Sequence, residues 1–135
     1  SERLTLYNEL SKIKEEEKLK RFEKNLEDRF GEIPPQGIEL LNTLRLKWLA
    51  SKFGLDRLIV KQNKCIGYFI SDQQSDFFQT SVFDQILNAV QSDSQSMSIK
   101  EKQTRNGLRL LFIVENVYSI EKLHQKLEAI LTPLE

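Results

Sequence analysis

The chain has 135 residues, of which 39% are hydrophobic and 30% charged, a globular composition with enough length for one real core. Its 20 Lys and Arg balance its 20 Asp and Glu, so no overall field steers it onto nucleic acid or an acidic membrane. The single cysteine, Cys65, excludes an intrachain disulfide framework and a multi-cysteine zinc site, and it fits a reducing compartment. No apolar run approaches the roughly 20 residues of a membrane span.

The chain starts without Met or a signal peptide and enters a helical pattern at once, so we expect a piece of a larger protein. Apolar spacing predicts a first helix over residues 2–13 and a second over about 15–30. Gly31 suits the left-handed stop of the second helix, and Pro34-Pro35 can open the next. The apolar stripe of the second helix recurs at intervals of three and four residues: Leu19, Phe22, Leu26 and Phe30.

Further helices are predicted along the chain. One over about 35–53 is apolar over much of its circumference, so we expect it to be central. Residues 71–80 are largely polar and predict a loop. The next helix follows Ser81, which forms a variant of the capping box with Asp84, and polar residues 91–96 come after it as a connector. Ser119 is predicted to cap a last helix that ends near Pro133.

Two hairpins are predicted between these helices. The first joins Leu58–Lys61 to Cys65–Ile70, and the second joins Met97–Gln103 to Leu108–Glu115. The second signal is strong because Asn106-Gly107 tolerates positive φ.

The predicted order is therefore three helices, a hairpin, a helix, a hairpin and a helix. Short hairpin links imply antiparallel pairing, hence an α+β fold in which a small antiparallel sheet packs against helices. We expect a single domain over residues 1–135, with a helical part over 1–54 and an α+β part over 55–135.

Signs of catalysis are weak. The sequence has no phosphate-binding loop, dinucleotide-binding glycine pattern or metal-ligand spacing. A catalytic pair of Cys65 and His124 is possible in principle, but ordinary burial and exposure explain both. The alternating carboxylates and lysines indicate a solvated face rather than an acid–base pair. Gly67 lies in a predicted strand, where it marks a bulge or a close backbone approach. Phe77 and Phe78 either anchor a partner or fold back onto the core, and we favour the core.

Four basic residues cluster around the second hairpin: Lys100, Lys102, Arg105 and Arg109. A basic hairpin can contact phosphates, so a nucleic-acid-binding module is the alternative function. Glu101 and Glu115 dilute the charge, and no aromatic platform accompanies it. We therefore favour an edge strand protected by charge and expect no direct contact with nucleic acid.

The last turn of the second helix holds an acid and a base, Asp28 and Arg29. Arg29 suits the negative end of the helix, whereas Asp28 opposes it. An acid placed against its local preference can serve a contact with a partner. The alternative, which helix physics alone favours, is a local ion pair of Asp28 with Lys24 or Arg21.

Several motifs occur together in the N-terminal part of the chain: Arg3-Leu4-x-Leu6-Tyr7, Leu26-x-Asp28-Arg29-Phe30-Gly31-x-Ile33-Pro34, Leu40-Leu41-x-x-x-Arg45-Leu46 and Ala50-x-x-x-Gly54-Leu55. In combination they resemble the C-terminal domain of bacterial transcription-repair coupling factors, the Mfd family. The resemblance is dense over residues 3–55. Beyond them it rests on element order and on Arg109-Leu110 followed by a terminal helix.

The resemblance implies a large, cytoplasmic bacterial parent that recognises RNA polymerase stalled at DNA damage. The parent's ATP-dependent, helicase-like DNA translocase motor, with its ATP and Mg, and its UvrB-like module, which recruits UvrA, lie in other domains. The terminal domain itself is implied to be a non-catalytic, autoinhibitory regulator without a cofactor or metal. It folds against the UvrB-like module and masks the UvrA-binding surface.

The resemblance also implies which residues make this contact. In the family, part of the clamp is an acidic residue followed three positions later by Asp-Arg, at the end of the second helix. Asp28 and Arg29 match that pattern. Asn25 occupies the acidic position, so one of the expected charge contacts is weaker in this chain.

Overall fold

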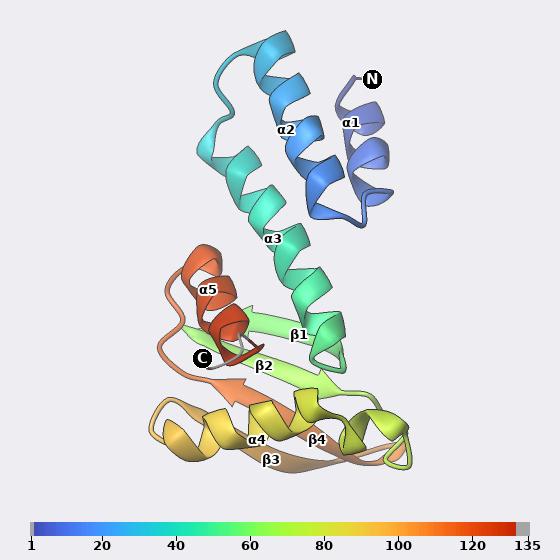
Figure 1. The fold of residues 1–135 in the computed structure, drawn as a ribbon, viewed down its shortest axis with the longest axis vertical. Helices are drawn as coiled ribbons and strands as arrows, with labels where there is room; N and C mark the ends of the chain where they lie inside the picture. Colours follow the sequence, from blue (N-terminus) through green and yellow to red (C-terminus); the bar gives the residue numbers. More distant parts are fainter. Residues whose placement is uncertain (1, 132–135) are drawn as a thin grey trace. The chain divides into compact units, whose positions relative to one another are not determined.

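The computed structural model describes residues 2–131, which form two compact units (Figure 1). We call Ser1–Arg45 the helical unit and Leu46–Glu135 the sheet unit. The helical unit contains α1 (Glu2–Ser11), α2 (Glu16–Phe30) and the first part of α3 (Pro35–Lys52). The last turns of α3 belong to the sheet unit, because their apolar side chains join its core.

The predicted helices α2 and α3 are confirmed to within one residue at each end. Gly31 ends α2 as predicted, and its N–H donates to the Glu27 carbonyl over 2.8 Å. Its φ of 83° is positive, but its ψ of −158° lies outside the left-handed region that was expected. The first helix is shorter than predicted, since α1 ends at Ser11. The N–H groups of Lys12 and Ile13 bond three residues back, to Glu9 and Leu10, so the chain tightens into a turn there.

The sheet unit holds four antiparallel strands in the order β1-β2-β4-β3, and the α+β prediction is confirmed. The strands are β1 (Leu55–Lys61), β2 (Lys64–Phe69), β3 (Met97–Thr104) and β4 (Gly107–Val114). Both hairpins are confirmed, although β1 begins earlier than predicted. The second hairpin pairs Thr104 with Gly107 at its turn, and positive φ is confined there to Gly107 rather than shared with Asn106.

Two predictions between the hairpins are wrong. Residues 71–80 are not all loop, since a 3-10 helix, η1 (Asp76–Gln79), forms within them. The cap of α4 (Ser81–Ser92) is Thr80 rather than Ser81. Thr80 has extended backbone angles, and its Oγ1 accepts from the Phe83 N–H over 3.4 Å, whereas Ser81 is already helical.

The connector predicted over 91–96 begins late, because α4 continues to Ser92. Ser119 caps α5 (Ile120–Leu131) as predicted, and its Oγ accepts from the Lys122 N–H over 3.1 Å. The predicted helix end near Pro133 lies outside the described residues. No helix within residues 2–131 is both long and apolar enough to cross a membrane.

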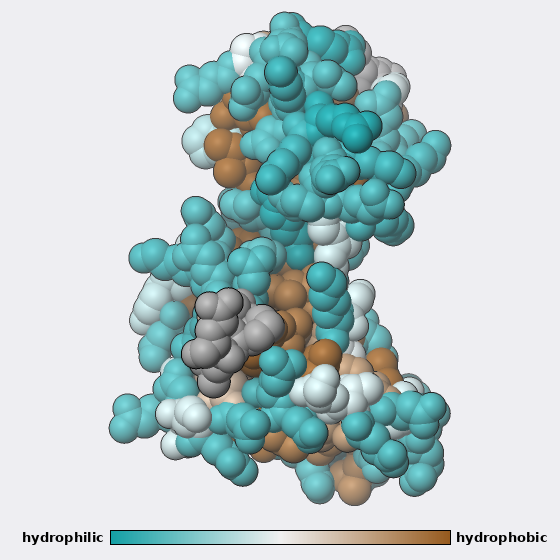
Figure 2. Space-filling model, in the orientation of Figure 1, coloured by the Kyte–Doolittle hydropathy of each residue, from teal (hydrophilic) through white to brown (hydrophobic). Residues whose placement is uncertain are grey.

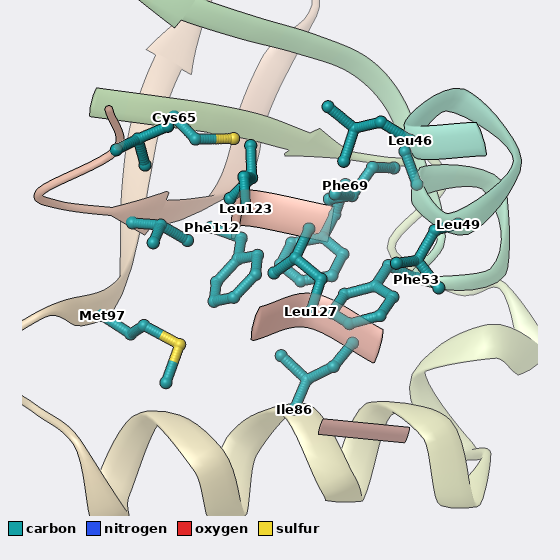
Figure 3. Close-up of a cluster of buried hydrophobic side chains, with 14 residues drawn as sticks. Leu46, Leu49, Phe53, Cys65, Phe69, Ile86, Met97, Phe112, Leu123 and Leu127 are labelled. Carbon is teal, nitrogen blue, oxygen red and sulfur yellow. The ribbon is translucent and has the colours of Figure 1, made fainter. Parts of the chain in front are cut away.

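One face of the sheet carries the main core of the sheet unit (Figure 3). Phe69 and Phe112 from the strands meet Ile86 from α4 and Leu127 from α5, and all four are at most 1% exposed. In Figure 1, α4 and α5 lie in front of the strands. Helices therefore cover this face, as expected for an α+β layer.

Aromatic packing extends this core to η1. The rings of Phe77 and Phe78 lie 6.2 and 6.1 Å from the Phe69 ring, so the prediction that they pack onto the core is confirmed. Gly67 is a site of close approach, because a Cβ there would lie 2.7 Å from Leu55 Cδ1. Its neighbour β1 carries the register irregularity, between Leu55 and Arg57.

Candidate interaction surface

The predicted contact residues lie on one side of α2. Asn25, Asp28 and Arg29 are spaced at i, i+3 and i+4, which places them together on the helix surface. All three are exposed. The helix therefore presents an amide, a carboxylate and a guanidinium side by side at its C-terminal end. We call these three residues the α2 polar patch.

The local ion pair considered for Asp28 does not form. Within the described part of the chain, neither Lys24 nor Arg21 lies in ion-pair range of the Asp28 carboxylate. Arg29 turns toward the next residue instead, with its Cζ 5.0 Å from the centroid of the Phe30 ring. Asp28 thus keeps an exposed carboxylate at the negative end of a helix, where nothing among the described residues compensates it.

An apolar pocket of about 450 Å³ borders the α2 polar patch within the helical unit. Its walls come from α1, the last turns of α2, the loop that follows and the start of α3. Three of the lining residues are close to Asp28 in the sequence: Leu26, Phe30 and Gly31. Two of its lining side chains are half exposed, Tyr7 at 49% and Phe30 at 52%. Apolar side chains accordingly reach the surface of the helical unit (Figure 2). Polar groups that fix register thus lie beside apolar area that can be buried.

Arg45 holds α2 and α3 together and was not assigned a role from the sequence. Its Nε donates to both carboxylate oxygens of Glu16, at 3.0 and 3.1 Å, and its Nη2 lies 3.7 Å from Glu23. Its Nη1 donates to Asn42 over 3.3 Å. The sequence did contain a signal for this role. Arg45 follows the buried Leu41 by four residues in α3, so both lie on the same, buried side of the helix.

The four basic residues of the second hairpin do not form one cluster. Strand register places Lys100, Lys102 and Arg109 on one face of the sheet, whereas Arg105 lies in the turn. Arg109 Nη2 pairs with Asp56 at 2.6 Å and donates to the Phe69 carbonyl at 2.7 Å. The Arg109 guanidinium therefore fixes the end of the neighbouring strand pair. β3 is an edge strand, as the favoured interpretation of an edge protected by charge requires.

The described residues give no support for a catalytic pair of Cys65 and His124. Cys65 is 1% exposed in the core, and burial raises the pKa of its thiol to about 12, so the thiol is protonated at neutral pH and is a poor nucleophile. No hydrogen bond joins it to His124 in residues 2–131. In the same part of the chain, no group of three or more His, Cys, Asp or Glu side chains is placed to hold a metal.

Comparison with known proteins identifies the family of the chain. A family model of the TRCF domain matches residues 1–80, more than half of the length. The chain belongs to the TRCF-domain family. The matched region covers the whole helical unit of this TRCF domain, including the α2 polar patch, and continues through both strands of the first hairpin.

A solved structure described as the C-terminal domain of transcription-repair coupling factor has a similar fold. It is 23% identical to this TRCF domain, with a TM-score of 0.64 over 95% of this chain and 78% of that chain. At this identity the likeness shows a shared fold. The search of curated proteins found no match. The family resemblance expected from the sequence motifs is confirmed.

Proposed function

We propose that this TRCF domain is the autoinhibitory C-terminal domain of a transcription-repair coupling factor. In this proposal it packs on the UvrB-like module of the same parent chain and masks the surface that binds UvrA in transcription-coupled nucleotide excision repair. The parent is a cytoplasmic bacterial ATP-dependent DNA translocase that acts on stalled RNA polymerase. ATP and Mg belong to its motor domains, and this domain is a non-catalytic regulator.

The observation that carries the proposal is the exposed carboxylate of Asp28. An aspartate at the C-terminal end of a helix is unfavourable unless a cation compensates it. None of the described residues does so. A cationic side chain on the UvrB-like module would supply the missing partner, and an acid on that module would match Arg29.

The apolar pocket beside the α2 polar patch supports the proposal that this surface contacts the UvrB-like module. Phe30 and Tyr7 are about half exposed, and a partner that covers them gains hydrophobic free energy. Charged contacts set register and orientation more than raw affinity. An interface that combines a modest apolar pocket with exposed charges suits a contact that must form within one chain and later release.

Release in this scheme is a shift of population. RNA polymerase and DNA would bind the parent with the domain displaced more tightly than with it docked. Moving such an equilibrium from 1:99 to 99:1 requires a difference in affinity of about 10⁴-fold. Asn25 cannot provide the charge of the family's acidic residue, so the docked state is held by one charge contact fewer. RNA polymerase and DNA therefore need a smaller difference in affinity between the two states to displace the domain.

The test is binding of this domain to the separately expressed UvrB-like module of the parent, measured by calorimetry. We expect the double reversal Asp28→Lys with Arg29→Glu to weaken binding about tenfold or more, because both charges then meet like charges. In the full-length parent the same reversal should increase capture of UvrA.

The matched control is Glu17→Lys with Lys18→Glu. These residues form an adjacent acid and base on the same helix, both exposed, about 16 Å along the axis from Asp28. Their reversal should leave binding unchanged. Equal affinity of the wild-type domain and the Asp28/Arg29 reversal would show that the α2 polar patch is not part of the interface.

A further inference from the structure

The sheet has a second face on which no helix packs in the described part of the chain. Successive side chains of a strand point to opposite faces, and the main core takes one set. The other set forms a separate cluster of Tyr68, Leu111 and Ile113, with Ile59 and Ile66 packed against it. All of these residues come from strands. We call this side of the sheet the open face.

Strand register arranges the open face in rows. Ile59 pairs with Ile66, and Ile66 pairs with Ile113, so three isoleucines lie in a line across three strands. Lys61 and Lys64 pair with each other one row further along. Rows are two residues apart along a strand, or about 6.6 Å.

Cations also lie on the other side of the isoleucine row. There, Arg57, Lys102 and Arg109 approach the ring of Tyr68, with their charged ends 5.3, 5.6 and 5.6 Å from its centroid. Lys100 pairs with Leu111 in the same region. The open face therefore has an aliphatic centre with lysines on one flank and a larger group of cations on the other. Within this centre Ile59 and Ile66 are half-buried and offer the accessible apolar area, whereas Leu111 and Ile113 are each 8% exposed.

Much of this positive charge has no acidic partner. Arg109 pairs with Asp56, and Lys64 lies 3.3 Å from Glu115. Four other cations of the open face make no ion pair with any described residue, and all four are exposed: Arg57, Lys61, Lys100 and Lys102. A chain that is neutral as a whole thus concentrates uncompensated positive charge around one apolar row.

We propose that the open face binds an acidic amphipathic helix of a protein partner. The apolar centre requires apolar side chains from the occupant, and the flanking cations require carboxylates on both sides of them. The two flanks are about 13 Å apart, two rows of a strand, which accommodates a helix about 10–12 Å across. Four strands span about 14 Å, the length of roughly nine or ten helical residues.

Nucleic acid fits this surface less well. Single-stranded nucleic acid is held by bases stacked on aromatic side chains. The one aromatic ring of the open face, Tyr68, is 9% exposed and lies under three cations. Lys102 Nζ also bonds to its hydroxyl at 3.3 Å. The aliphatic side chains of the isoleucine row cannot form hydrogen bonds or ion pairs with phosphates.

The inference goes beyond the proposed function and is independent of it. The open face belongs to the sheet unit and includes none of the α2 polar patch, and its variants leave Asp28 and Arg29 in place. A loss of binding at either surface is therefore distinguishable from a loss at the other.

The experiment titrates the whole chain with a fluorescent peptide of about 18 residues, with Leu at helical spacing and Glu at the flanking positions. A scrambled peptide of the same composition and a DNA duplex are the comparison probes. We expect micromolar binding of the amphipathic peptide and much weaker binding of the scrambled one. Lys61→Glu with Lys100→Glu, one change on each flank, should weaken binding about tenfold or more.

Two further variants separate charge from apolar contact. Ile59→Thr with Ile66→Thr keeps β-branched residues in the strands but removes apolar area, and it should also weaken binding. Lys47→Glu with Lys122→Glu makes the same charge change at exposed helical positions of the sheet unit and should have little effect.

Three results would overturn the proposal. The first is absence of peptide binding at millimolar concentration. The second is equal binding of the scrambled peptide, which would make the surface a simple charge patch. The third is tight, salt-dependent binding of DNA that the Lys61/Lys100 variant abolishes while the peptide fails to bind. Circular dichroism of each variant establishes that the fold is retained.

Discussion

The helical unit and the sheet unit bury their apolar side chains to very different extents. Of the eight largest fully buried side chains among the described residues, seven belong to the sheet unit and only Leu19 to the helical unit. Of eight large hydrophobic side chains that stay exposed, five lie in the helical unit, although it has half the length of the other. The sheet unit thus completes its own core, whereas the helical unit leaves apolar surface open.

This difference indicates that a partner would gain most hydrophobic free energy by covering the helical unit. A short helical segment has too much surface for its volume to cover all its apolar side chains. The same unit carries the pocket and the α2 polar patch. In the sheet unit, helices cover one face, and the exposed remainder is charged rather than broadly apolar. The following variants test this contrast, from the largest expected effect to the smallest.

The first prediction compares two phenylalanines. Phe69→Ala removes a ring that is 0% exposed and contacts four other rings, so we expect a loss of about 3–5 kcal/mol in the free energy of unfolding. Phe30→Ala, at 52% exposure in the helical unit, should cost less than about 1 kcal/mol. Urea denaturation followed by circular dichroism measures both. Equal losses would contradict the contrast between the two units.

The second prediction compares two glycines with positive φ. Gly54 and Gly31 have φ of 73° and 83°, and Gly31 has ψ of −158°, so alanine at either position carries backbone strain of about 1–3 kcal/mol. At Gly54 the new Cβ would also lie 2.5 Å from the Phe77 ring, whereas at Gly31 nothing lies within 4 Å. Gly54→Ala should therefore lower the melting temperature clearly more than Gly31→Ala. A larger effect at Gly31 would mean that the turn after α2 is the more constrained of the two.

The third prediction tests how well the core of the sheet unit excludes water. The pKa of Cys65 is raised from 9.0 to about 12, so the folded state keeps its proton while the unfolded chain loses it above pH 9. Its contribution to stability is complete below pH 9 and is lost as pH rises toward 12, by about 1.4 kcal/mol at pH 10. Urea denaturation at pH 7 and pH 10 should show a steeper fall for wild type than for Cys65→Ala. Parallel profiles would show that the thiol is not desolvated.

The fourth prediction concerns the brace between α2 and α3 in the helical unit. Arg45→Gln removes bonds to Glu16 and Glu23 from a side chain that is 20% exposed, and should cost about 1 kcal/mol, less at high salt. Lys18→Gln removes an exposed pair with Glu15 at 4.0 Å and should be neutral. Denaturation at low and high salt measures both. A loss at Lys18 that matches the loss at Arg45 would argue against a specific brace.

Local signals in the sequence predicted most of the elements. The stripe of α2, its stop at Gly31 and the two hairpins depend on residues a few positions apart, and all were found. The errors also arose locally, because Thr80 and Ser81 are both capable caps and only the path of the chain out of η1 selects Thr80. The α2 polar patch was named from family motifs, and its one-sided placement follows from helical spacing.

The sequence alone determined the order of the α-helices and strands, the antiparallel pairing of each hairpin, the TRCF family and the residues at the end of α2. Only the tertiary structure decided that β2 pairs with β4, that Arg45 joins Glu16 and Glu23, and that Arg57, Lys102 and Arg109 meet over one tyrosine. Caps, turns and periodicity act over a few residues, so a sequence displays them directly. The contacts between β2 and β4 join residues 43 to 49 positions apart, and they depend on which strands bury each other's side chains. That is settled only when the whole sheet forms.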